Sequence, residues 1–273
     1  MRFLTEPFQF EFFVRALIAA VIVGVTCGAV GTHVTLRNMS AIGNGLSQCT
    51  LGGVAVAVVA GVHPLAGALA GALLASWLLT VVTRHRGIHL DSAIGLVSTS
   101  MFALGVAVIS ANRESAPNLS DLLFGNVLAV TTSDIALVGI VGTIAVTWIE
   151  TAHKELTLTA FDPEGARTIV RDPARTELIF QLSLAAVVVA AVQVVGVLLI
   201  AATLVLPAAT ARLRARSATT MLRASALVGG GIAVVGLFTS YHADIASGPA
   251  IVLAGTAAFA LSWASQHRVG VAR

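Results

Sequence analysis

The chain has 273 residues, of which 57% are apolar and only 11% are charged, and its mean hydropathy is +0.93. A soluble domain carries about 25% charged residues, so the composition excludes an ordinary soluble protein and predicts an all-α, polytopic membrane bundle. The net charge of +3 does not indicate nucleic-acid binding, because membrane proteins retain lysine and arginine on their cytoplasmic side.

Nine apolar stretches approach the length of about 20 residues that a helix needs to cross a bilayer. The stretch 178–211 carries no charge and is too long for one span, so we interpret it as two short helices that meet near 193–196. If it forms one span and a re-entrant piece instead, the count is eight. The predicted spans are 16–36, 41–61, 62–83, 92–111, 130–149, two within 178–211, 224–240 and 249–264.

The basic residues support nine spans. With nine alternating spans, only Arg2, Arg15 and Arg113 fall on one side, and the other thirteen of the 16 lysines and arginines fall on the opposite side. Because cytoplasmic loops are enriched in lysine and arginine, the larger group is predicted to be cytoplasmic. The N-terminus is then outside and the C-terminus in the cytoplasm. Eight spans would place either an arginine-rich segment or the C-terminus outside.

The second predicted span carries a small polar island around Asn44 and Gln48. These two amides are four residues apart, so on a helix they project from one face. Unpaired polar groups are costly in hydrocarbon, so the pair needs either a neighbouring helix or a water-filled path. Ser47 is a further candidate path residue, although its glycine and leucine neighbours also suit helix packing.

The longest hydrophilic connection, 150–177, is predicted to be cytoplasmic. It contains Asp162 followed by Pro163, a pair that starts helices because the carboxylate caps the N-terminus and proline suits the first turn. A short helix is therefore expected here. Its charges would face a cytoplasmic partner, or solvent if the segment is only a connecting loop.

Several catalytic patterns are absent from the sequence. The single lysine, Lys154, is far from any glycine-rich loop, so the chain cannot hold ATP phosphates in a P-loop. There is no His-Glu-x-x-His or Gly-x-Ser-x-Gly motif, and no predicted span has an acid away from its ends, as ion-driven carriers commonly do. The chain is therefore not expected to be an enzyme. If it forms a transport pathway, that pathway is either passive or powered by another subunit.

A series of short motifs runs through nearly the whole chain. They are Val30-Gly31-Thr32 with 36–40, 42–53, 93–95 with 102–105, 123–126, 161–166, 194–199 with 206–212, and Ser240-Tyr241 with Asp244 and 247–249. Together, and in this order, they resemble the permease subunit of ATP-binding cassette importers for zinc, manganese and iron.

The resemblance implies a single permease domain over residues 1–273, in a bacterial plasma membrane. It implies that two permease copies form a homodimer around a central path. Separate cytoplasmic subunits would bind and use ATP, and an extracytoplasmic binding protein would deliver substrate, so this chain itself needs no cofactor. The cytoplasmic segment would couple ATPase closure to the path through Phe161, Asp162, Glu164 and Arg167.

The sequence departs from the family at Asn44 and Gln48, where the family has an aspartate and a histidine. Carboxylate and imidazole are strong ligands for manganese or zinc, whereas carboxamides are weak. The resemblance implies a divalent metal ion as the substrate, and the weaker ligands here add a metal-containing compound as a variant and leave the metal ligands open. The alternative role for the two amides is hydrogen bonding between helices, worth about 0.6 kcal/mol each.

Two other features are open to more than one interpretation. Pro207 lies within an apolar stretch and either kinks a gating helix or is an ordinary transmembrane proline. His33 lies deeper in a span than the other histidines, with no partner nearby in the sequence. Alternative functions are an ATP-independent channel or carrier, and a membrane scaffold that binds a soluble partner through 150–177.

Overall fold

The computed structural model describes residues 7–83, 90–112, 130–197 and 199–270. All regular structure in these residues is helical, as the sequence predicts. The expected motif at 123–126 and the basic residues Arg2 and Arg113 lie outside the described residues. The elements are η1 (Pro7–Gln9), α2 (Glu11–Leu36), α3 (Ile42–Val59), α4 (Pro64–Thr83), α5 (Leu90–Ala111), α7 (Thr132–Phe161), α8 (Pro163–Ile169), α9 (Pro173–Val195), α10 (Ile200–Arg212), α11 (Ala218–Ala243) and α12 (Ser247–Gly270).

Seven of these helices are long and apolar enough to cross a membrane, and Pro64–Leu79 and Ile200–Arg212 are shorter apolar helices. The chain is therefore a multi-pass helical bundle with seven to nine candidate spans. The predicted division of 178–211 is confirmed, since α9 ends at Val195 and α10 begins at Ile200. Gly196 ends α9 with φ of 91° and ψ of 158°, a conformation that is essentially restricted to glycine.

Polar caps start several of the helices. Thr131 and Asp134 form a capping box at the start of α7, and the Ser217 side chain accepts from Thr220 N at the start of α11. Asp172 caps α9 in the same way, with Pro173 in its first turn. These side chains satisfy backbone N–H groups that have no partner within the helix, which fixes where the helix starts.

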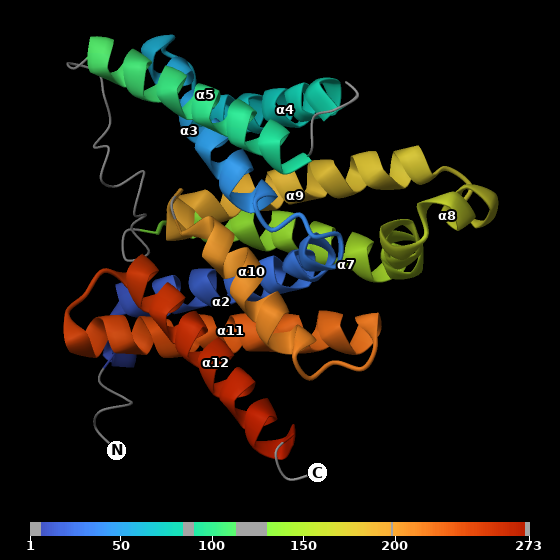
Figure 1. Cartoon of the computed structure of the whole chain (residues 1–273). Coiled ribbons are helices and arrows are strands. Elements are labelled where there is room, and N and C mark those ends of the chain that lie inside the picture. The colour runs from blue at the N-terminus through green and yellow to red at the C-terminus, as the bar shows by residue number, and fades with distance from the viewer. Residues whose placement is uncertain (1–6, 84–89, 113–129, 198, 271–273) are drawn as a thin grey trace.

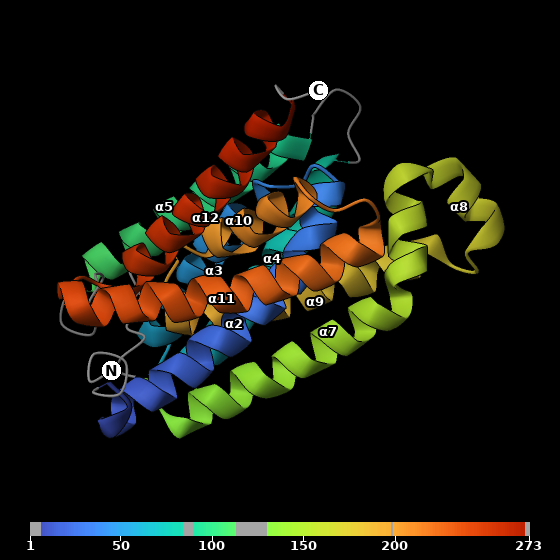
Figure 2. The same cartoon turned by 90° about the horizontal axis from the view of Figure 1, so that it is seen from below.

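The bundle has α2 at its centre. This helix packs most extensively against α11 and also contacts α7, α9 and α10. In Figure 1, α3, α4 and α5 form a group on one side of these helices, and α12 lies on the opposite side. Figures 1 and 2 both show α8 projecting beyond one end of the bundle, between the ends of α7 and α9.

Glycines allow the central helices to meet backbone to backbone. The sequence leaves open whether Gly24 and Gly28 pack within the chain or between two copies. In the structure both glycines pack within the chain. A Cβ at Gly24 would lie 2.4 Å from Gly229 O, and one at Gly28 would lie 2.4 Å from Ser225 O, both in α11. Ser225 Oγ also donates to Gly28 O at 2.6 Å. This crossing therefore tolerates only very small residues.

Candidate functional site

The two amides predicted to line a path lie on an open face of α3. Asn44 is in the first turn and exposed, and Gln48, one turn later, is partly exposed. Across the described part of the chain, neither side chain makes a hydrogen bond. Ser47 is instead fully buried, and its hydroxyl donates to Asn44 O at 2.9 Å. The structure thus brings Asn44 and Gln48 together and turns Ser47 into the bundle.

Small residues leave space for other helices around this turn of α3. A Cβ at Gly43 would lie 2.7 Å from the Leu204 side chain of α10, and one at Gly45 would lie 2.7 Å from the Ile94 side chain of α5. Both flanks of the turn are therefore packed, and Asn44 projects between them. An exposed amide on an otherwise apolar helix requires water or another polar surface.

A partly buried ion pair lies just before α3. The Arg37 guanidinium, at the end of α2, pairs with the Glu177 carboxylate of α9. Its Nη2 also donates to Thr159 Oγ1 of α7 at 3.0 Å, and its Cζ lies 4.4 Å from the centre of the Phe180 ring. The Arg37 side chain is only 7% exposed. Burial of a charge requires such partners, so these contacts hold three helix ends together.

Two histidines meet one helical turn deeper. His33 Nε2 of α2 lies 3.2 Å from His153 Nδ1 of α7, and His153 Nε2 lies 3.2 Å from Thr219 Oγ1 of α11. His33 is fully buried, and its Nδ1 has no partner among the described residues. The sequence shows no neighbouring partner for His33 because that partner is 120 positions away.

The remaining histidines and acids do not assemble a metal centre in the described residues. His63 and His242 are exposed and bond to nearby backbone, and His89 lies outside the described residues. No group of three or more His, Cys, Asp or Glu side chains in the described ranges is arranged to hold a metal ion.

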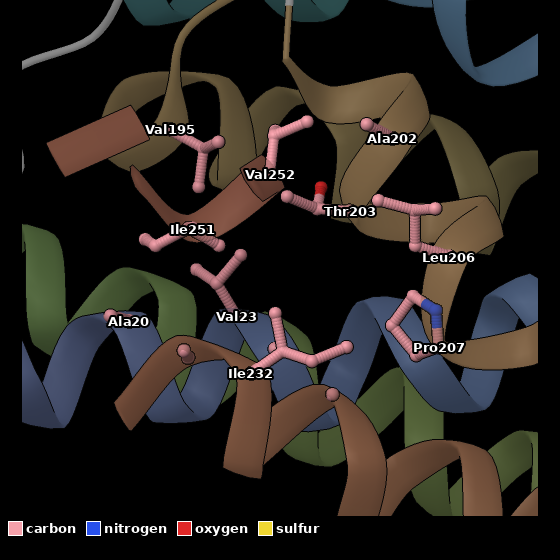
Figure 3. Close-up of a pocket in the computed structure, with 13 residues that line it drawn as sticks. Ala20, Val23, Val195, Ala202, Thr203, Leu206, Pro207, Ile232, Ile251 and Val252 are labelled. Atoms are coloured by element: carbon pink, nitrogen blue, oxygen red, sulfur yellow. The ribbon is translucent and has the colours of Figure 1, made fainter. Parts of the chain in front are cut away.

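Pro207 lies inside α10, where it removes the donor for the Thr203 carbonyl one turn earlier. Beside it is an apolar cavity of about 20 Å³. Figure 3 shows Val23, Ile232, Ile251 and Val252 facing this cavity across from Pro207. The cavity is about the size of one water molecule and has apolar walls, so it is a packing gap rather than a ligand site.

Comparison with known proteins gives the family of this chain. The pattern that describes the ABC 3 transport family matches residues 9–266. The chain belongs to this family. It is a membrane-spanning permease subunit of an ATP-binding cassette importer, and the ATPase is a separate subunit, in agreement with the missing P-loop. The resemblance inferred from the sequence motifs is confirmed.

Several curated relatives align with the permease over nearly its whole length. The manganese import system permease protein ScaB of Streptococcus gordonii is 38% identical over 255 residues, covering 93% of this chain and 91% of the relative. The manganese transport system membrane protein MntC of Listeria monocytogenes is 34% identical, with 99% and 96% covered. A probable iron transport system membrane protein of Haemophilus influenzae is 31% identical, with 96% of each covered.

Solved structures agree with the fold. PsaBC from Streptococcus pneumoniae in complex with Fab superposes with a TM-score of 0.86 and 36% identity, covering 96% of this chain and 94% of that chain. An inward-facing conformation of a putative metal-chelate type ABC transporter has a TM-score of 0.77 at 14% identity and shows the fold alone.

The short helix predicted within the 150–177 connection is present as α8. The Asp162 carboxylate accepts from Gly165 N at 2.9 Å, and Pro163 occupies the first turn, so the predicted cap is confirmed. The helix spans Pro163–Ile169, so it begins two residues after Phe161, where the predicted coupling segment begins. Phe161, Asp162, Glu164 and Arg167 are exposed at this end of the bundle, as contact residues for another subunit would need to be.

Proposed function

We propose that this permease imports a divalent metal ion, with manganese the first candidate, through a path lined by Asn44 and Gln48. The observation that carries this proposal is the open position of the two amides on α3, where neither makes a hydrogen bond to a described residue. They occupy the sequence positions where the family resemblance places an aspartate and a histidine. The names of the relatives include manganese and iron. Carbonyl-type oxygen ligands, such as those of amides, suit manganese better than they suit softer metals.

A metal-containing compound is the second candidate substrate, and one observation favours it. Asn44 and Gln48 are neutral, so they neither attract a bare cation electrostatically nor ligate it strongly. Amides can instead donate as well as accept hydrogen bonds, which suits a chelate with polar groups. Family membership leaves no role for the alternatives of an ATP-independent carrier or a membrane scaffold.

The path is proposed to form between two copies of the permease. Asn44 is exposed on the surface of one chain, and an amide facing lipid would lose its hydrogen bonds with water. A second copy that places its own Asn44 opposite would enclose the amides in a polar channel. A homodimer of this kind forms a single path from one sequence.

The orientation is proposed from charge and from contacts at one end of the bundle. The ends of α2, α7 and α9 meet through Arg37, Thr159 and Glu177, and Arg214 beyond α10 donates to Ser265 of α12 at 2.7 Å. These residues lie in or beside the connections predicted to be cytoplasmic. With nine spans, the N-terminus is then outside. ATP-binding subunits contact α8, and the substrate-binding protein docks at the opposite end.

The test is uptake into vesicles that contain the complete transporter, with manganese, zinc, iron and haem offered separately. The double variant Asn44→Asp, Gln48→His should raise the apparent affinity for a divalent ion by about tenfold or more, since a nearby carboxylate attracts a cation by several kcal/mol at protein-like dielectric. Asn112→Asp is the matched control, because it adds a charge at an exposed amide at the end of α5. If the apparent affinity of the double variant for a divalent ion is unchanged, the two amides do not line the path.

A further inference from the structure

The last turn of α2 joins the two helices that carry α8. Arg37 pairs with Glu177, four residues into α9, and donates to Thr159, two residues before the end of α7. In the chain, α8 lies directly between these two helices, and both figures show it held at their ends. Any movement of α8 that shifts α7 and α9 therefore acts on the Arg37 guanidinium.

A second contact strengthens the same connection. His33 lies one turn before Arg37 on α2 and meets His153 of α7, which in turn contacts Thr219 at the start of α11. The ends of α7, α9 and α11 are thus joined to one turn of α2 by polar side chains rather than by apolar packing alone. Directional contacts of this kind have discrete arrangements, which is what a switching element requires.

On its other side, Arg37 is connected to the amide site through a short, hydrogen-bonded turn. Asn38 has φ of 55°, and Met39 N donates to Val34 O at 3.0 Å. Ile42 N, at the start of α3, donates to Met39 O at 3.0 Å. Asn44 follows two residues later. The turn contains no long flexible stretch, so displacement of Arg37 is passed to the first turn of α3.

The burial of Arg37 is not explained by stability alone. The Arg37 side chain is 7% exposed and that of its partner Glu177 is 34% exposed, and an ion pair largely removed from water contributes little net stability because desolvation offsets the attraction, which leaves room for a role in switching. Arg37 Nε is also buried with no hydrogen-bond partner among the described residues. A buried donor without a protein partner calls for a specific explanation, and a change of contacts between two states is one such explanation.

We infer that Arg37 is a positioning residue that transmits movement of α8 to the amide site, with Glu177 and Thr159 as its anchors on α9 and α7. The inference rests on the proposed function, because it takes Asn44 and Gln48 as the end of the transmission. In the assembled transporter, ATPase closure moves α8, and the Arg37 contacts make α3 move with it.

The first experiment measures transported metal per ATP hydrolysed in vesicles containing the complete transporter. Arg37→Gln and Glu177→Gln should each lower this ratio by about tenfold, a typical coupling effect, while ATP hydrolysis continues. The double variant should be no worse than Arg37→Gln alone, since both single variants break the same ion pair. Arg15→Gln is the matched control, because Arg15 pairs with Glu11 at the exposed start of α2.

The second experiment does not depend on which substrate is carried. A spin label at Ala41→Cys, an exposed position at the start of α3, reports movement there, and the native Cys27 and Cys49 are buried. In the wild-type complex, ATP should change the label spectrum. Arg37→Gln should abolish that change, and Arg15→Gln should retain it.

The outcomes separate this inference from the proposed substrate. If the wild-type complex carries none of the offered metals but Ala41 still responds to ATP through Arg37, the substrate proposal fails and the transmission stands. If Arg37→Gln keeps both the transport ratio and the ATP response, the inference is wrong. It is equally wrong if the loss of transport only follows a loss of assembled complex, because Arg37 is then purely structural.

Discussion

At the scale of single residues, the contact between α2 and α11 depends on the absence of a side chain. A Cβ at Gly229 would lie 2.1 Å from Gly24 O, whereas a Cβ at Gly231, two positions later on the same helix, would have nothing within 4 Å. Gly229→Ala is therefore expected to destabilise the protein by about 1–3 kcal/mol through overpacking. Gly231→Ala should leave stability unchanged or slightly raised. Thermal unfolding in detergent, followed by size-exclusion chromatography, measures both variants.

The same pair of variants also tests the arrangement of the helices. If Gly229→Ala and Gly231→Ala unfold at the same temperature, the close crossing of α2 and α11 is incorrect. The two substitutions have the same effect on intrinsic helix propensity, so only their surroundings differ.

At the scale of elements, α8 is too short to be stable without help. A helix of seven residues is marginal on its own, and an N-cap is worth about 1 kcal/mol. Asp162→Ala should therefore loosen α8 and lower the metal transported per ATP, whereas Asp162→Asn should retain most of it, because asparagine caps equally well. Transport and ATP hydrolysis measured on the same vesicles test this expectation.

The control for this prediction separates capping from charge. Glu164 is exposed in the first turn of α8, so Glu164→Gln removes a carboxylate while the Asp162 cap remains. If Asp162→Asn is as impaired as Asp162→Ala, the carboxylate contacts a partner directly and capping is not its main role.

At the scale of the whole molecule, the proposed orientation places α8 and the turn between α3 and α4 on opposite sides of the membrane. Thr168 on α8 and Val62 in that turn are both exposed, and the two native cysteines are buried. In inside-out vesicles, a membrane-impermeant thiol reagent should label Thr168→Cys and spare Val62→Cys. Right-side-out vesicles should give the reverse. Labelling of both cysteines from one side would rule out nine alternating spans.

Much of the fold could be predicted because membrane helices are determined locally. Apolar length predicts the spans, and the absence of charge over 178–211 together with Gly196 predicts the break between α9 and α10. Asp162 and Pro163 predict the start of α8 from neighbouring residues alone. The amide pair was also recognisable, because two polar residues four positions apart in an apolar segment share one helix face.

The contacts around Arg37, at the end of the bundle that carries α8, could not be predicted in the same way. Arg37 and Glu177 are 140 positions apart, and each has the ordinary appearance of a charged residue at the end of a span. His33 and His153 are 120 positions apart, and no periodicity relates them. A useful signal was present in His33 and Arg37, which share a helix face, but it did not identify their partners.

The sequence by itself determined the class of protein, the position of most helices and the lack of an ATP site, because hydropathy, caps and motifs act over a few residues. Only the tertiary structure decided which helices meet, that Gly24 and Gly28 of α2 pack against α11, and that Arg37 joins α7 and α9. The physical reason is that the partner of a buried charge, or of the backbone at a glycine, is whichever distant segment the packing of the helices brings next to it.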